Sequence, residues 1–198
     1  MNPQQPSLYL ASSSPRRAEL LTQIGVCFEV LQCSIDETAS ASETPAQYVS
    51  RMAMQKASEG FRVMAELSKS PLPVLAADTI VVVNEKILGK PESEEHAADM
   101  LRQLSGTTHN VMTAVTVMSE RGVDTVISDT RVEFRDVSEA EASAYWQSGE
   151  PGDKAGGYGI QGMGAIFVAR IEGSYSGVVG LPLAETGGLL QSVGIRCL

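Results

Sequence analysis

A polar segment at residues 12–17, with the sequence SSSPRR, constrains the fold more than any other stretch of the chain. It follows a short apolar run at 8–11 and precedes apolar residues at helical spacing, so the pattern predicts a strand, a polar loop and a helix. Ser14 is a favoured N-cap, Pro15 suits the first helical turn, and Gly25 suits the position just after the helix end. We therefore expect the loop to end at the N-terminus of a helix.

The predicted loop gathers groups that bind phosphate. A helix N-terminus offers backbone N–H groups and the positive end of the helix dipole, and the segment adds three hydroxyls and the guanidiniums of Arg16 and Arg17. These groups suit a multiply charged anion, which predicts a cradle for a triphosphate. A capped surface helix with two solvated arginines would show the same six residues, so the rest of the chain has to separate the two interpretations.

Composition limits the classes of protein and partner. With 43% hydrophobic residues, a chain of 198 residues is able to bury a sizeable core in one domain or in two small lobes. The formal net charge of −9 and the pI near 4.7 argue against nucleic acid or an anionic membrane as a partner. The three cysteines lack the paired spacing of a zinc site, residues 1–10 lack the pattern of a leader, and no apolar run approaches the roughly 18 residues of a membrane helix. We expect a cytoplasmic protein with reduced thiols.

Two adjacent carboxylates follow the second predicted strand. Residues 26–33 alternate as a strand does, and Asp36 and Glu37 come in the loop after it. Such a pair supplies hard oxygen ligands for a divalent cation, although a simply solvated acidic loop has the same sequence.

A long helix is predicted after Thr44, which forms a capping box with Gln47 around Pro45. Apolar residues then repeat at helical spacing as far as Met64, and Lys56 lies among them. A lysine in this position either snorkels from the edge of the core or faces a ligand cleft.

The most apolar strand of the chain is predicted at 74–83 and has Asp78 inside it. An ionised carboxylate in a buried strand is costly unless it is paired, hydrogen-bonded or bound to metal, so Asp78 is a candidate functional residue. The alternative is a satisfied structural carboxylate or an outward-facing position. Residues 84–86 then turn the chain, and a hairpin there would return Lys90 toward the same region, where it could neutralise phosphate.

A glycine-rich loop is predicted at 152–162. Its five glycines allow close backbone approach to a ligand, Asp153 and Lys154 carry charge, and Gln161 offers the donor and the acceptor that suit a base edge. A flexible connector is the alternative, but charged, aromatic and aliphatic residues are spaced among these glycines where such connectors have serine.

The remaining pattern predicts further elements around these motifs. They are a helix from Ser93 to near Gly106, an antiparallel hairpin of strands at 109–119 and 123–137, a helix from the capping box Ser138–Glu141 to near Gly149, a strand at 167–171 and a helix after Pro182 that Gly187-Gly188 should weaken. The two histidines, His96 and His109, lie in different predicted elements and lack triad or metal spacing, so we assign neither a catalytic role.

Taken together, these stretches resemble the Maf family of nucleoside triphosphate pyrophosphatases, over nearly the whole chain. The resemblance rests on Ser12-x-Ser-Pro-Arg-Arg17, Asp36-Glu37, Lys56, Asp78-Thr79, Gly89-Lys90-Pro91, Asp153-Lys-Ala-Gly156, Tyr158-Gly-Ile-Gln-Gly162, Gly173-Ser-Tyr175 and Val179-Gly-Leu-Pro182. Within the family, Arg17, Thr79 and Gln161 resemble the specificity set of the branch that acts on dTTP and UTP. A sister branch that prefers 7-methyl-GTP tends to have Trp before the arginine, Gln after the aspartate and Glu in the late loop. Gly157, where alanine is common, and the Gly187-Gly188 pair are minor departures.

The resemblance implies an α/β fold similar to that of inosine triphosphatases, with two lobes, an elongated mixed β-sheet flanked by helices, a central cleft for the nucleotide, and often a homodimer. We expect residues 1–198 to form a single domain of two lobes, between which the sequence marks no boundary. The residues themselves predict only a mixed α/β fold, because the hairpin at 109–137 argues against a doubly wound parallel sheet.

The implied reaction is attack of water on the α-phosphorus, which needs a divalent cation such as Mg²⁺ or Mn²⁺, cationic side chains and an oriented water. We assign Asp78 as the base and a metal ligand, and Glu37 as a further metal or water ligand. The substrate-binding set is Ser12, Arg16, Arg17, Lys56, Thr79, Lys90 and Gln161. A nucleotide-binding regulator of septum formation without significant turnover is the alternative, and a sanitising activity on modified pyrimidine nucleotides is a second one.

Overall fold

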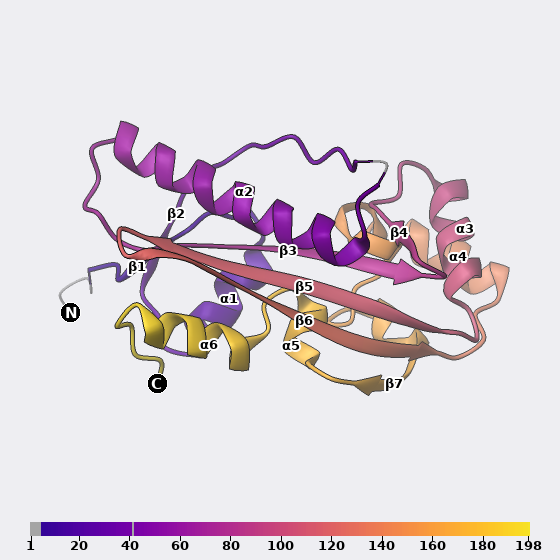
Figure 1. The fold of residues 1–198 in the computed structure, drawn as a ribbon. Coiled ribbons are helices and arrows are strands. Elements are labelled where there is room, and N and C mark those ends of the chain that lie inside the picture. Colours follow the sequence, from indigo (N-terminus) through magenta and orange to yellow (C-terminus); the bar gives the residue numbers. More distant parts are fainter. Residues whose placement is uncertain (1–4, 41) are drawn as a thin grey trace. The chain divides into compact units, whose positions relative to one another are not determined.

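The computed structural model describes residues 5–40 and 42–198 (Figure 1). Its strands are β1 (Leu8–Leu10), β2 (Phe28–Val30), β3 (Val74–Val83), β4 (Lys86–Leu88), β5 (Thr108–Ser119), β6 (Gly122–Phe134) and β7 (Val168–Glu172). Its α-helices are α1 (Pro15–Gln23), α2 (Pro45–Glu66), α3 (Glu94–Leu104), α4 (Glu139–Gln147), α5 (Tyr175–Val179) and α6 (Leu183–Ser192), and short 3-10 turns are η1 (Pro151–Asp153), η2 (Ala155–Gly157) and η3 (Met163–Phe167). Residues 1–4, part of the stretch for which we expect no leader, lie outside the described residues.

The strands form a mixed sheet, as the sequence predicts. The strand order is β2-β1-β3-β5-β6-β7, and β4 pairs with β3 beside this path. Strand β1 runs parallel to β2 and β3, whereas β4 is antiparallel to β3, and β7 is antiparallel to β6. Helices accompany the sheet, so the predicted mixed α/β class is confirmed (Figure 1).

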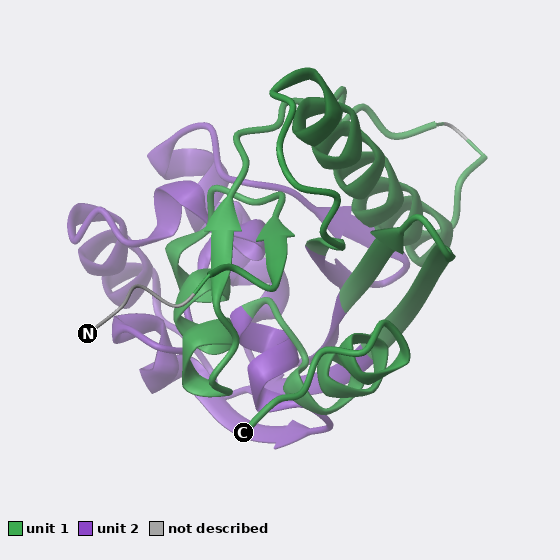
Figure 2. Ribbon diagram, turned by 90° about the vertical axis from the view of Figure 1, so that its left-hand side faces the viewer, with its two compact units in different colours: residues 1–78, 113–128, 180–198 green, residues 79–112, 129–179 purple. Residues whose placement is uncertain are grey.

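The chain divides into two compact units, coloured separately in Figure 2. Unit 1 comprises residues 1–78, 113–128 and 180–198, and unit 2 comprises residues 79–112 and 129–179. One boundary falls between Asp78 and Thr79, in the middle of β3, where the sequence is uniformly apolar on both sides. No linker composition marks this boundary, because a continuous strand passes through it.

In unit 1, helix α2 packs closely on β1 and β3. Ala57 and Met64 of α2 share a buried cluster with Tyr9, Ala11 and Val74. Gly60 permits this close packing, since a Cβ at this position would lie 2.7 Å from Ala11 Cβ and 2.8 Å from Val74 Cγ1. The predicted capping box that begins α2 is confirmed, with both reciprocal bonds between Thr44 and Gln47 formed.

In unit 2, aromatic rings fill the core beneath α3 and α4. Phe134 stacks edge-to-face with Tyr158 at a centroid distance of 4.7 Å, and His109 packs edge-to-face on both rings. His109 is 1% exposed and its Nε2 lies 2.9 Å from the Tyr158 hydroxyl. Burial lowers the pKa of His109 to about 4, so the imidazole is a neutral core group.

The hairpin and most helix ends agree with the sequence predictions, whereas several details differ. The predicted turn before β4 is confirmed, with Asn84 and Glu85 in the left-handed conformations of a type I′ turn. Strand β2 is much shorter than the predicted 26–33, and α5 was not predicted. Helix α6 continues through Gly187-Gly188, because a buried face that includes Leu189 and Leu190 outweighs the low helix propensity of glycine.

Two expectations from the sequence, one for the cysteines and one for membrane helices, concern the described residues as a whole. All three cysteines lie within them, and none forms a disulfide. None of the helices in this part of the chain is long and apolar enough to cross a membrane.

Candidate active site

Lys56 joins two carboxylates from different elements of unit 1. Its ammonium Nζ lies 2.7 Å from Asp78 Oδ1 in the middle of β3 and 2.7 Å from Glu37 Oε1 in the loop after β2. The side chains of Lys56 and Asp78 are 18% and 14% exposed, and that of Glu37 is 50% exposed. The structure thus brings together three predicted site residues in one partly buried cluster.

The cluster shows how the charges of Lys56 and Asp78 are satisfied, and both a functional and a structural carboxylate at position 78 would be paired in this way. Lys56 lies beside the buried Ala57 of α2, but its ammonium is held by carboxylates and does not simply extend into solvent. Asp78 is ion-paired, which removes the cost of burying an isolated charge. One ammonium thus faces two carboxylates, and the charges of both carboxylates also act on the guanidinium of Arg17.

The loop between β1 and α1 orients Arg17. Ser12 Oγ accepts hydrogen bonds from Arg17 Nη1 and from the Ser14 N–H, both at 3.2 Å, and Arg17 Nε donates to the Gly180 carbonyl at 2.8 Å. Burial lowers the pKa of Arg17, the charges of Asp78 and Glu37 raise it, and Arg16 lowers it. These charges act on Arg17 because the guanidinium lies near the carboxylate cluster.

Helix α1 begins after Ser14 without a side-chain cap. Ser14 occupies the N-cap of α1, as predicted, but its side chain makes no capping hydrogen bond. The first N–H groups of α1 are therefore not satisfied by the capping side chain, which suits an anion-binding terminus. At the other end, Gly25 has φ of 75° and the Val26 N–H bonds to the Leu21 carbonyl, as in a Schellman motif.

Helix α2 also fixes the backbone of the Glu37 loop. The Tyr48 hydroxyl donates to the Glu37 carbonyl at 2.8 Å, and Arg51 Nη2 donates to the Thr38 carbonyl at 3.1 Å. Asp36, the neighbouring carboxylate, accepts from the Thr38 N–H and hydroxyl, and these hydrogen bonds lower its pKa. The two adjacent acids therefore differ, since Asp36 shapes the loop and Glu37 contacts Lys56.

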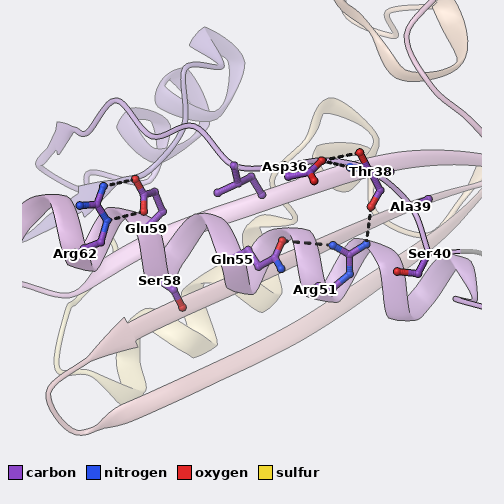
Figure 3. Close-up of a pocket in the computed structure, with 10 residues that line it drawn as sticks. Asp36, Thr38, Ala39, Ser40, Arg51, Gln55, Ser58, Glu59 and Arg62 are labelled. Carbon is purple, nitrogen blue, oxygen red and sulfur yellow. Dashed lines mark hydrogen bonds and ion pairs between the residues drawn. The ribbon is translucent and has the colours of Figure 1, made fainter.

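This loop and α2 line a pocket of about 670 Å³, which Figure 3 shows. Arg51 points to Thr38 and Gln55 there, and Arg62 pairs with Glu59. Its lining includes the sequence neighbours of Glu37 and Lys56, but not Glu37, Lys56 or Asp78 themselves.

The donor set at Glu37 and Asp78 fits a hard divalent cation. Within residues 5–40 and 42–198, no group of three or more His, Cys, Asp or Glu side chains could hold a metal by itself. Mg²⁺ is commonly bound through one or two carboxylates together with substrate phosphates, and Glu37 and Asp78 meet at one ammonium. The residues thus fit a cation that is shared with a bound phosphate.

Unit 2 contains the other predicted site residues. Thr79 is half-buried in β3, Lys90 is exposed after β4, and Gln161 is exposed in the glycine-rich loop. The Gly156 N–H donates to the Gly89 carbonyl at 2.9 Å, which ties the glycine-rich loop to the Lys90 turn.

The glycine-rich loop is more ordered than the sequence indicates. Lys154 Nζ donates to Asp153 Oδ1 at 2.7 Å and to the Glu150 carbonyl at 2.6 Å, so its charge is used within the loop. Sequence reasoning missed Glu150, whose carboxylate organises the following turn. The only sequence signal is an acidic residue directly before Pro151 and the glycines.

The chain is similar to known proteins over nearly its whole length. The model of the Maf-like protein family matches residues 7–193. A dTTP/UTP pyrophosphatase from Saccharophagus degradans is 54% identical over 93% of this chain and 88% of that protein. A protein with the same name from Escherichia coli O157:H7 is 52% identical over 94% of this chain and 92% of its own. Among solved structures, the crystal structure of protein VC0702 from Vibrio cholerae matches over 67% of this chain and 64% of that protein's chain, with a TM-score of 0.35 and 7% identity.

Proposed function

The chain belongs to the Maf family, and we propose that it is a nucleoside triphosphate pyrophosphatase that hydrolyses dTTP and UTP to the monophosphate and pyrophosphate. The observation that carries this proposal is the cluster of Lys56 with Glu37 and Asp78, near which Arg17 lies. The similarity to two proteins named dTTP/UTP pyrophosphatase, which are 54% and 52% identical to nearly the full chain, supports the same reaction.

In the proposed mechanism, Asp78 orients a water molecule and accepts its proton. The water oxygen forms a bond to the α-phosphorus, the bond from this phosphorus to the bridging oxygen breaks, and pyrophosphate leaves. Lys56 holds Asp78 and Glu37 in place and offsets part of their mutual repulsion, so that the base stays oriented while negative charge gathers in the substrate.

Phosphate binding is assigned to the N-terminus of α1 and to nearby cations. Ser12, Arg16 and Lys56 would contact the triphosphate, and Ser12 together with the Gly180 carbonyl orients Arg17 beside them. We assign Lys90 of unit 2 to phosphate as well, on the resemblance alone.

A divalent cation, when bound, would withdraw negative charge from the phosphate oxygens. Glu37 and Asp78 would hold it, because they are the hard oxygen donors of the cluster. We infer Mg²⁺ or Mn²⁺ from this donor chemistry.

Base recognition is assigned to Arg17, Thr79 and Gln161. Uracil and thymine present an N3–H donor between two carbonyl acceptors, and an amide such as Gln161 is able to accept from N3–H and donate to a carbonyl. Cytosine lacks that N3–H, so CTP should be a poor substrate.

We also propose that the two units act as a single domain and that the protein forms a homodimer. We further propose that it is cytoplasmic and binds neither nucleic acid nor membrane.

The test is pyrophosphate release from a panel of nucleoside triphosphates, with Mg²⁺, with Mn²⁺ and with excess EDTA. We expect cation-dependent release from dTTP and UTP. Tight nucleotide binding with no release would instead favour a nucleotide-binding regulator of septum formation, and full activity in EDTA would exclude the metal role. Methylated pyrimidine triphosphates belong in the panel, because one methyl group changes transition-state binding by only about 1–3 kcal/mol.

A further inference from the structure

Glu150 lies at the centre of a hydrogen-bond network that holds the segment 159–164. Its Oε1 accepts from the Tyr145 hydroxyl at 2.7 Å and from the Gly164 N–H at 3.1 Å, and its Oε2 accepts from the Met163 N–H at 2.8 Å. The Tyr145 hydroxyl in turn accepts from the Gly159 N–H at 3.0 Å. Two side chains therefore fix the segment at both ends, and Gln161 lies between these ends.

The glycines of this segment are explained by the network. A Cβ at Gly162 would overlap the Glu150 carboxylate, and a Cβ at Gly164 would lie 2.7 Å from the Tyr145 hydroxyl oxygen. A Cβ at Gly159 would lie 2.6 Å from Lys154 Cε. These three glycines therefore let the backbone lie close to the Glu150 carboxylate, the Tyr145 hydroxyl and the Lys154 side chain.

The network rests on a fixed support. Tyr145 is 3% exposed and its ring packs edge-to-face on Phe167, with centroids 5.2 Å apart. Burial tends to raise the pKa of Glu150, but the hydrogen bonds from Tyr145, Met163 and Gly164 outweigh it and lower the pKa, so the carboxylate stays ionised at neutral pH. Gln161 is exposed, while the backbone on either side of it is held.

We propose that Tyr145 and Glu150 are positioning residues for base recognition, which hold the segment 159–164 so that the Gln161 amide is presented in one orientation. This inference rests on the proposed function, in which Gln161 distinguishes uracil and thymine from cytosine. Discrimination by hydrogen bonds depends on fixed geometry, because a mobile amide is able to adapt to the wrong base. Neither residue needs to touch the nucleotide.

The test variant is Tyr145→Phe, which removes the hydroxyl and keeps the ring on Phe167. The matched control is Tyr9→Phe, because Tyr9 is also 3% exposed and its hydroxyl donates to the Ser70 carbonyl within unit 1. We expect Tyr145→Phe to lower the ratio of kcat/KM for UTP to that for CTP by about tenfold, mainly through a higher KM for UTP, and the control to leave the ratio unchanged. Glu150→Gln should lower the ratio in the same direction.

Amide hydrogen exchange separates positioning from general damage. In Tyr145→Phe, exchange should rise at residues 159–164 and stay at the parent level in α3 and in β6. Increased exchange there with an unchanged UTP to CTP ratio would overturn the inference, and so would equal losses of activity on both nucleotides. If the parent protein itself cleaves UTP and CTP equally, base recognition by Gln161 fails before any variant is tested, and the inference fails with it.

Discussion

The ammonium of Lys56 lies 2.7 Å from a carboxylate oxygen of Asp78, and this contact joins helix α2 to the middle of strand β3. The same ammonium reaches Glu37, so three charged groups from separate elements depend on one another. Substitutions within such a group are not additive, because each removes a partner of the others.

Asp78→Asn should retain nucleotide binding and lose turnover. The amide keeps the size of the carboxylate but is unable to accept a proton from water, and loss of a general base costs about 10²–10⁴-fold in rate. Calorimetric titration with UTP would check binding, and pyrophosphate release would check turnover. A kcat near that of the parent would show that Asp78 is not the base.

Lys56→Gln should reduce kcat/KM for UTP by about tenfold or more, because the carboxylates of Glu37 and Asp78 would then face each other without the ammonium. Arg62→Gln is the control on the same helix, since Arg62 is 54% exposed and its ion pairs with Glu59 and Glu66 are at the surface. Equal activities of the two variants would contradict a special role for Lys56.

Tyr48→Phe should raise the Mg²⁺ concentration needed for half-maximal activity, with kcat at saturating Mg²⁺ close to that of the parent. The variant loses the hydrogen bond to the Glu37 carbonyl, and one such bond contributes about 0.5–1.5 kcal/mol. Binding of Mn²⁺, followed by electron paramagnetic resonance, would measure the effect without turnover. Mn²⁺ affinity equal to that of the parent would count against Glu37 as a ligand.

Gln161→Glu should erode the preference for UTP and dTTP over CTP and the purine triphosphates. A carboxylate accepts from N3–H but offers no donor for the neighbouring carbonyl, and each lost hydrogen bond is worth about 1–3 kcal/mol when a partner stays buried. We expect the parent to cleave dTTP and UTP with comparable kcat/KM. Parent values that are equal for UTP, CTP and GTP would overturn the base-reading role.

Stability should fall when the pH is lowered from about 6.5 to about 4. Burial lowers the pKa of His109 from 6.5 to about 4, so in this window the unfolded chain binds a proton that the folded protein excludes. His109→Gln should therefore flatten the dependence of Tm on pH between these values, whereas His96→Gln, at an exposed position, should not. Identical slopes for both variants would show that other groups control acid stability.

Much of the candidate site in unit 1 could be predicted from the sequence. Asp78 interrupts a continuous apolar strand, and Lys56 interrupts an apolar helical stripe. Both are charges in positions that burial disfavours, so each requires a partner. Their pairing with each other could not be predicted, because it depends on the tertiary placement of α2 against β3.

Neither the role of Glu150 nor the division of the chain into two compact units could be predicted from the sequence. Glu150 follows a helix in a stretch that resembles a solvated loop, and its burial depends on how glycine backbone folds around it. The unit boundary between Asp78 and Thr79 lies within one strand, and this polar pair interrupts the apolar run without the turn or linker residues that would mark a boundary. The sequence placed Ser14 correctly at the start of a helix. It did not show that the Ser12 hydroxyl oxygen accepts hydrogen bonds from the Ser14 N–H and from Arg17.

Gly60 lies one helical turn beyond Lys56, on the side of α2 that meets Ala11 and Val74. Because Gly60 has no Cβ, helix α2 packs closely on the sheet at this point. This close packing brings the Lys56 side chain within contact distance of Asp78. The spacing of the charges around Lys56 therefore depends on close packing between apolar groups one helical turn away.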